Sequence, residues 1–135
     1  MSQVQATVVA VPGAELYATL HGSGPVLLIL QGGYGSADAV PAFVDSLAGR
    51  FRVVTYDRRG QSRSPVLDPD VPVTIGTHAD DADALLREVA DGAAYLFGSS
   101  IGAVIGRQAC RCSTDAGRPR ATARATASAT GPSGA

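Results

Sequence analysis

The chain has 135 residues and a formal net charge of −1, and all of its basic residues are Arg. This length allows at most one domain. Five Arg but only one Asp fall in residues 107–135, so the preceding part is acidic, which argues against nucleic-acid binding. The chain starts without a basic leader, and its longest strongly apolar run, residues 26–30, is too short for a bilayer. We therefore expect a cytoplasmic protein without a membrane anchor.

Short apolar and β-branched stretches bounded by turn residues predict strands. The run at residues 26–30 is wholly apolar, which is typical of a strand covered on both faces. Pro12 and Gly13 predict a turn between the first two strands. The predicted strands are residues 5–11, 15–21, 26–30, 52–56 and 93–97.

Three apolar stripes have helical spacing. They consist of Val40, Phe43, Val44 and Leu47, of Ala82, Leu85, Leu86 and Val89, and of Ile101, Val104 and Ile105. Thr77 is predicted to cap the second helix, with Asp80 and Asp81 in its first turn. Strands that alternate with helices indicate an α/β fold with a mainly parallel sheet and flanking helices.

The alternating pattern stops at residue 107. Residues 107–135 contain no Val, Ile, Leu, Met, Phe, Tyr or Trp. We divide the chain into a folded part, 1–108, and a low-complexity tail of Ala, Thr, Arg and Ser, 109–135. The tail is expected to be disordered because it cannot bury enough apolar surface. A change of reading frame near residue 107 explains this break best, and an evolved tail is the alternative.

The only cysteines, Cys110 and Cys112, fall in this predicted tail. Two residues apart and without a second pair, they predict neither a disulfide framework nor a metal site. We interpret them as thiols of an unstructured segment.

Residues 98–102 have the pattern G-x-S-x-G, with Ser100 at its centre. They lie between the strand predicted at 93–97 and the helix that begins at Ile101. A serine at such a junction is held on a tight turn with its hydroxyl exposed, as a nucleophile requires. The helix N-terminus directs backbone N–H groups at developing negative charge. A plain turn of small residues is the alternative interpretation.

A glycine-rich loop, Gln31-Gly32-Gly33-Tyr34-Gly35, follows the strand at 26–30. Its backbone N–H groups could form half of an oxyanion hole, with the N–H of Ile101 as the other half. A plain glycine-rich loop is the alternative. Because the chain has no Lys and Asp38 occupies the third glycine position of a dinucleotide fingerprint, we expect no phosphate-binding loop and no cofactor.

Charged residues and a glycine follow the strand at 52–56 directly, in the segment 56–64. We predict a structural loop held by Asp–Arg pairs near the edge of the sheet. The two histidines, His21 and His78, both precede Ser100. We interpret them as ordinary surface or loop residues.

Together these motifs resemble the α/β-hydrolase superfamily over about residues 10–108. The glycine loop stands where that family often has His-Gly-Gly, with Gln31 in place of the histidine. Residues 56–64 look like its D-x-R-G-x-G-x-S segment, and residues 98–102 stand at its nucleophile elbow.

The resemblance implies that Ser100 is the nucleophile and that Gly33 and Ile101 supply the oxyanion-hole amides, with Tyr34 as the alternative to Gly33. It implies hydrolysis of a small ester, lactone or similar acyl substrate without a cofactor. Other chemistry on the same fold, of the cofactor-free haloperoxidase, epoxide hydrolase or dehalogenase type, is the alternative. The last two normally need an Asp at the centre of the elbow, so Ser100 argues against them.

The acid and histidine of the family come later in the chain, after further strands. No histidine follows Ser100 in this sequence. We therefore expect little or no turnover from this truncated chain. A non-catalytic binding fragment and a frame-shifted product without its own function are the alternatives. A small-molecule substrate is the expected partner, and the oligomeric state is left open.

Overall fold

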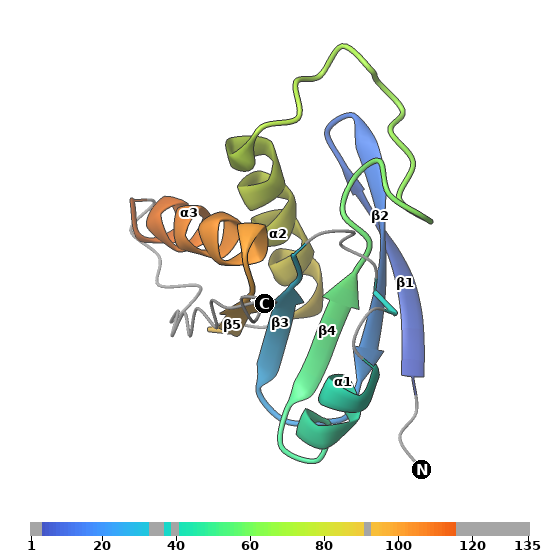
Figure 1. Cartoon of the computed structure of the whole chain (residues 1–135), viewed down its shortest axis with the longest axis vertical. Helices are drawn as coiled ribbons and strands as arrows, with labels where there is room; N and C mark the ends of the chain where they lie inside the picture. Colours follow the sequence, from blue (N-terminus) through green and yellow to red (C-terminus); the bar gives the residue numbers. More distant parts are fainter. Residues whose placement is uncertain (1–3, 33–36, 39–40, 91–92, 116–135) are drawn as a thin grey trace, which may run out of the picture.

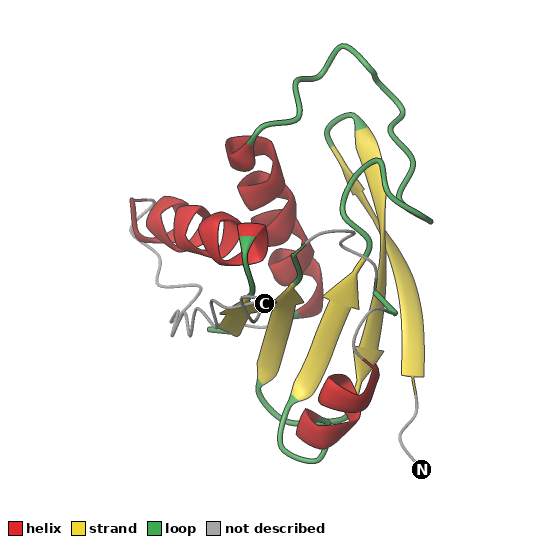
Figure 2. Ribbon diagram, viewed as in Figure 1, coloured by secondary structure: helices red, strands yellow, loops and turns green. Residues whose placement is uncertain are grey.

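The computed structural model describes residues 4–32, 37–38, 41–90 and 93–115. One sheet with helices on both faces confirms the predicted α/β fold (Figures 1 and 2). The elements in chain order are β1 (Val4–Val11), β2 (Ala14–His21), β3 (Val26–Leu30), α1 (Pro41–Leu47), β4 (Arg52–Tyr56), α2 (Ile75–Val89), β5 (Tyr95–Gly98) and α3 (Ile101–Asp115). The predicted strands agree with these bounds to within two residues.

The described strands follow the order β1-β2-β4-β3-β5 across the sheet. β1 and β2 form an antiparallel hairpin, and β2 also pairs antiparallel with β4. The hairpin turn holds Gly13 at φ 79°, a conformation that favours glycine. β4, β3 and β5 are parallel. Their carboxyl ends, at Tyr56, Leu30 and Gly98, therefore lie at one edge of the sheet, where α/β folds commonly place ligands.

Successive side chains of β3 and β4 point to opposite faces of the sheet, and each face has its own apolar cluster. α2 and α3 cover one face, and α1 covers the other (Figure 1). The larger cluster includes Leu28, Leu30, Val54, Leu85 and Ile105. The smaller cluster is built from Ile29, Val44 and Val53. Burial on both faces explains why β3 is wholly apolar.

α2 begins one turn earlier than the sequence analysis predicts. Thr74 is the N-cap, and Thr77 occupies the N3 position. Each hydroxyl accepts a hydrogen bond from the other residue's backbone N–H at 3.1 Å, which forms a capping box. The predictions of Thr77 as the cap and of Asp80 and Asp81 in the first turn are therefore wrong. One turn further into the helix, Asp81 faces the interior.

α3 continues to Asp115, past the boundary predicted at residue 108, and residues 116–135 lie outside the described part of the chain. Cys110 is on this helix and packs against the larger apolar cluster, so its assignment to an unstructured segment is wrong. Burial raises the pKa of its thiol. In the described part of the chain, no helix has the length and apolar character needed to cross a membrane.

A buried ion pair connects the loop after β4 to α2. Arg59 donates from Nε and Nη2 to the two carboxylate oxygens of Asp81, both at 2.8 Å. The two side chains are only 1% and 3% exposed. Arg59 Nη2 also donates to the carbonyl of Pro12 at 2.7 Å, which attaches the β1–β2 hairpin to the same group. Buried charges need strongly hydrogen-bonded partners such as these to be tolerated.

Replacing Arg59 with Met is expected to lower the free energy of unfolding by about 3–5 kcal/mol, because the Asp81 carboxylate would stay buried without its partner. The double variant Arg59→Met/Asp81→Leu should recover part of this loss, since both charges are then gone. Urea unfolding followed by circular dichroism measures both effects. The control Arg87→Met removes an exposed guanidinium paired with Asp83 at 2.9 Å, and should cost less than about 0.5 kcal/mol. Equal losses in the two single variants would contradict the prediction.

Candidate active site

The predicted nucleophile lies at the edge of the sheet where the parallel strands end. β5 ends at Gly98, and α3 begins at Ile101. Ser100 is on the turn between them, is exposed, and has φ 56°. A positive φ is rare for a residue with a side chain and is concentrated at functional sites. The backbone geometry at Ser100 is therefore that of a nucleophile elbow.

Small residues on both sides of Ser100 allow this turn to form. A Cβ added to Gly98 would lie 2.6 Å from the Cα of Ala103, and one added to Gly102 would overlap the carbonyl of Leu30. The same Leu30 carbonyl accepts a hydrogen bond from the N–H of Ser99 at 3.0 Å. The elbow is thus attached directly to the end of β3. A larger residue at 102 would force the elbow and β3 apart, and one at 98 would clash with the first turn of α3.

The loop that follows β3 reaches the elbow at Gly32. A Cβ added to Gly32 would lie 2.9 Å from the Cβ of Ser100 and 3.0 Å from the carbonyl of Ser99. The predicted oxyanion-hole residue Gly33 and its alternative Tyr34 lie outside the described residues. The other predicted donor, Ile101, is the first residue of α3. First-turn amides have no acceptor within their own helix and point toward its N-terminal end.

Asp57 and Arg58 follow β4 at the same edge and are both buried. Asp57 Oδ1 accepts a hydrogen bond from the N–H of Ala37 at 2.7 Å, and its Oδ2 accepts from Arg63 Nε at 2.8 Å. Burial opposes the charge of Asp57, but the hydrogen bonds from Arg63 and Ala37 outweigh it, so the pKa of Asp57 is lowered. Arg58 Nη1 donates to the carbonyl of Gln31 at 2.6 Å.

The Asp–Arg pairing predicted for residues 56–64 is therefore present. The partners of these charged residues outside the loop, such as Ala37 and Gln31, were not predicted from the sequence. The sequence contains only part of the information needed. Three charged residues in succession after an apolar strand indicate buried charge, but the tertiary structure decides which groups become their partners.

The two histidines lie on β2 and α2, outside the turn that holds the predicted nucleophile. His21 ends β2 and pairs with Val53 near the start of β4, at the opposite end of the sheet from Ser100. His78 is half-buried on α2, and its pKa is lowered by burial and by the positive charge of Arg58. Within the described residues neither histidine hydrogen-bonds to Ser100. No group of three or more His, Cys, Asp or Glu side chains in that part of the chain could hold a metal ion.

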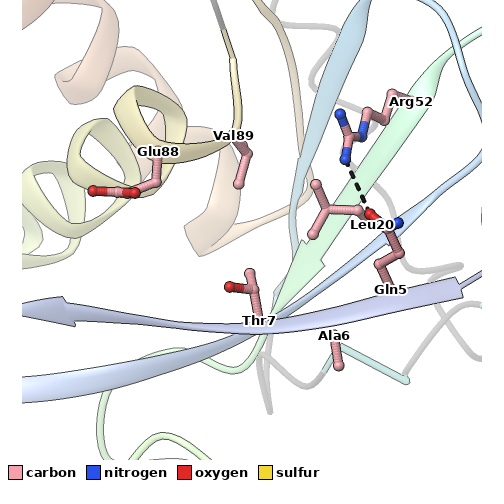
Figure 3. Close-up of a pocket in the computed structure, with 7 residues that line it drawn as sticks. All are labelled: Gln5, Ala6, Thr7, Leu20, Arg52, Glu88 and Val89. Atoms are coloured by element: carbon pink, nitrogen blue, oxygen red, sulfur yellow. Dashed lines mark hydrogen bonds between the residues drawn. The ribbon is translucent and has the colours of Figure 1, made fainter.

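A pocket of about 610 Å³ lies at the other end of the sheet (Figure 3). It is bounded by the β1–β2 hairpin, the first residue of β4 and the end of α2. Arg52 donates to Gln5 Oε1 across it at 3.2 Å. The lining residues are Gln5, Ala6, Thr7, Leu20, Arg52, Glu88 and Val89. None of them is a predicted site residue, so this pocket is separate from the elbow.

The family model described as alpha/beta hydrolase fold matches residues 25–113. The uncharacterized hydrolase YraK of Bacillus subtilis strain 168 is 46% identical over 100 residues, which are 74% of this chain and 37% of that protein. The structure of a hydrolase from Pseudomonas aeruginosa PA01 is 26% identical with a TM-score of 0.75, and the match covers 86% of this chain and 43% of that one. A variant of the Vigna radiata epoxide hydrolase is 25% identical with a TM-score of 0.71, over 88% of this chain and 36% of that one.

The chain thus spans less than half the length of these relatives. The matched residues include the elbow, Gly32 and the loop after β4. The resemblance seen in the motifs is confirmed by sequence and by structure, and the chain belongs to the alpha/beta hydrolase fold family.

Proposed function

We propose that Ser100 is the nucleophile of a hydrolase that acts on a small ester, lactone or similar acyl substrate. The observation that carries the proposal is the exposed Ser100 at φ 56°, on a strand-to-helix turn with Gly32 packed against it. In the reaction, Ser100 Oγ bonds to the carbonyl carbon, a base takes the hydroxyl proton, and the bond to the leaving alcohol breaks. Water then hydrolyses the acyl-enzyme.

Two backbone amides would stabilise the oxyanion of this reaction, in our proposal those of Ile101 and Gly33. Ile101 is supported by its place at the first residue of α3, where the N–H points out of the helix end. Gly33 is supported by its neighbour Gly32, which lies against Ser100. Such donors accelerate acyl transfer because they are already oriented when charge develops.

The nature of the nucleophile separates this proposal from the chemistry of the epoxide hydrolase among the similar structures. Opening an epoxide through a covalent intermediate on this fold uses a carboxylate at the centre of the elbow, and this chain has the hydroxyl of Ser100 there. A serine oxygen is suited to attack on an acyl carbon, which leaves an ester that water can cleave.

We also propose that this chain by itself turns substrate over poorly. Nucleophilic attack needs a base near Oγ, and no histidine follows Ser100 in the sequence. Loss of the histidine from a serine triad lowers kcat on the order of 10⁶-fold, because the hydroxyl then keeps its proton. What remains is the electrostatic contribution of the amides.

A fluorophosphonate is expected to add one phosphonyl group to the chain, slowly and at Ser100, and faster when imidazole is present as an external base. Intact mass spectrometry and peptide sequencing measure the extent and the position. Ser100→Ala should abolish the adduct, whereas the matched control Ser99→Ala, which removes the neighbouring hydroxyl, should keep it. Equal labelling of the wild type and Ser100→Ala would refute Ser100 as nucleophile and favour a non-catalytic binding fragment.

Hydrolysis of p-nitrophenyl acetate tests the second proposal. Without imidazole, the chain is expected to release p-nitrophenol no faster than Ser100→Ala, because the hydroxyl stays protonated. With imidazole, the wild type should exceed Ser100→Ala, whose rate corrects for hydrolysis by imidazole itself. Turnover well above Ser100→Ala without added base would show that the chain already contains a working base.

A further inference from the structure

We propose that Asp57 and Arg58 are positioning residues that fix both flanks of the segment expected to supply an oxyanion-hole amide. This inference rests on the proposed function. Arg58 Nη1 contacts the Gln31 carbonyl at 2.6 Å, directly before that segment. Asp57 Oδ1 contacts the Ala37 N–H at 2.7 Å, directly after it. Two consecutive residues of one strand end thus contact the chain on either side of Gly33.

The sheet ladder does not provide this attachment. The register between β3 and β4 runs from the Val26–Arg52 pair to the Leu28–Val54 pair. Beyond Leu28, β3 is paired along its other side, with β5, as far as the Leu30–Gly98 pair. The side chains of Asp57 and Arg58 therefore connect the end of β4 to the chain after β3, where backbone pairing between those two strands has stopped.

The hydrogen bond from Arg58 also sets an orientation. A peptide unit is planar, and its C=O and N–H point in opposite directions. Holding the Gln31 carbonyl therefore fixes the N–H of Gly32 as well, together with the direction in which the chain leaves toward Gly33. Gly32 is the residue that lies against Ser100. An error in the Gln31–Gly32 peptide plane would move the following amide relative to the nucleophile.

The flank at Ala37 has a second attachment through Arg63. Arg63 donates to Asp57 Oδ2 at 2.8 Å and pairs with Asp38 at 3.0 Å. Asp57 is fully buried and Arg58 is 6% exposed, so both groups give up hydration for these contacts. Charge-assisted hydrogen bonds of this kind hold backbone atoms within a narrow range of positions. These contacts therefore hold the described residues on both sides of Gly33 in place, as support for an oxyanion-hole amide would require.

Weakening this support is expected to slow attack by Ser100. Removing one oxyanion-hole donor costs about 10²–10³-fold, so displacing a donor should cost up to about 10²-fold. The test measures the rate of fluorophosphonate labelling of Ser100 in the full chain, with imidazole present. Arg58→Met keeps an unbranched apolar stem but donates no hydrogen bond, and should label about 10–100-fold more slowly.

Two further variants separate positioning from general stability. Arg58→Lys keeps a donor that can reach the Gln31 carbonyl, and should restore part of the rate. Asp57→Asn keeps one acceptor oxygen for either Ala37 or Arg63, and should give an intermediate rate. The matched control Arg87→Met removes an exposed guanidinium on α2, and should label at the wild-type rate. Circular dichroism establishes that each variant is folded at the assay temperature.

Folded Arg58→Met and Asp57→Asn that label at the wild-type rate would overturn the inference. Loss of the fold in all three variants would also overturn it, since the pair would then serve stability alone. If wild-type Ser100 is not labelled above Ser100→Ala, the proposed function fails, and amide hydrogen exchange then decides on the positioning. The positioning role is supported if the amides of Gly32 and Ala37 exchange faster in Arg58→Met and Asp57→Asn while the β3–β5 ladder is unchanged. Unchanged exchange at both amides refutes this role.

Discussion

The site depends on a close backbone contact between the first turn of α3 and the end of β3. Gly102 lies so near the Leu30 carbonyl that a side chain there would overlap it, and the N–H of Ser99 donates to the same oxygen. β3 is itself paired with strands on both sides. The position of Ser100 is therefore set by an interior strand of the sheet. A strained non-glycine φ costs on the order of 1–3 kcal/mol and persists only where such contacts determine it.

Three buried charged residues in succession after β4 connect other segments of the chain to the same edge of the sheet. Asp57 reaches the chain at Ala37, Arg58 reaches Gln31, and Arg59 reaches Asp81 on α2. Charges taken out of water must find strong partners, and each of these finds its own on a different segment. The cost of burying them is offset by hydrogen bonds that specify where Gln31, Ala37 and α2 lie.

The sequence was sufficient where the controlling interaction is local. The apolar run of β3 predicts a strand because both of its faces are buried and no position can be polar. The elbow is predictable because the glycines that it requires, Gly98 and Gly102, lie two residues to either side of Ser100. The start of α2 was misplaced because Thr74 and Thr77 are both good caps, and they in fact cap each other's amides. Only the intervening backbone conformation decides between them.

Partners distant in sequence could not be predicted. Arg58 donates to the carbonyl of Gln31, and Arg59 donates to the carboxylate of Asp81. No local sequence pattern around the two arginines predicts either acceptor. The sequence assigned Cys110 to a tail because residues after 107 contain no large aliphatic side chain. The helix nevertheless continues past residue 107, because Ala109 and Cys110 pack against the larger apolar cluster. Both side chains are small enough to fit there.

Geometry and protonation are separable requirements at Ser100. The residues that place its oxygen, in β3, the elbow and the loop after β4, all lie within this chain and contact one another. A base must also stand next to that oxygen, but His21 is at the far end of the sheet, and His78 makes no hydrogen bond to Ser100 in the described part of the chain. Oxyanion-hole amides need no proton transfer to act, so their contribution survives when the base is missing. In the function that we propose, proton removal therefore limits the reactivity of Ser100 in this chain, whereas the turn that places its oxygen is already formed.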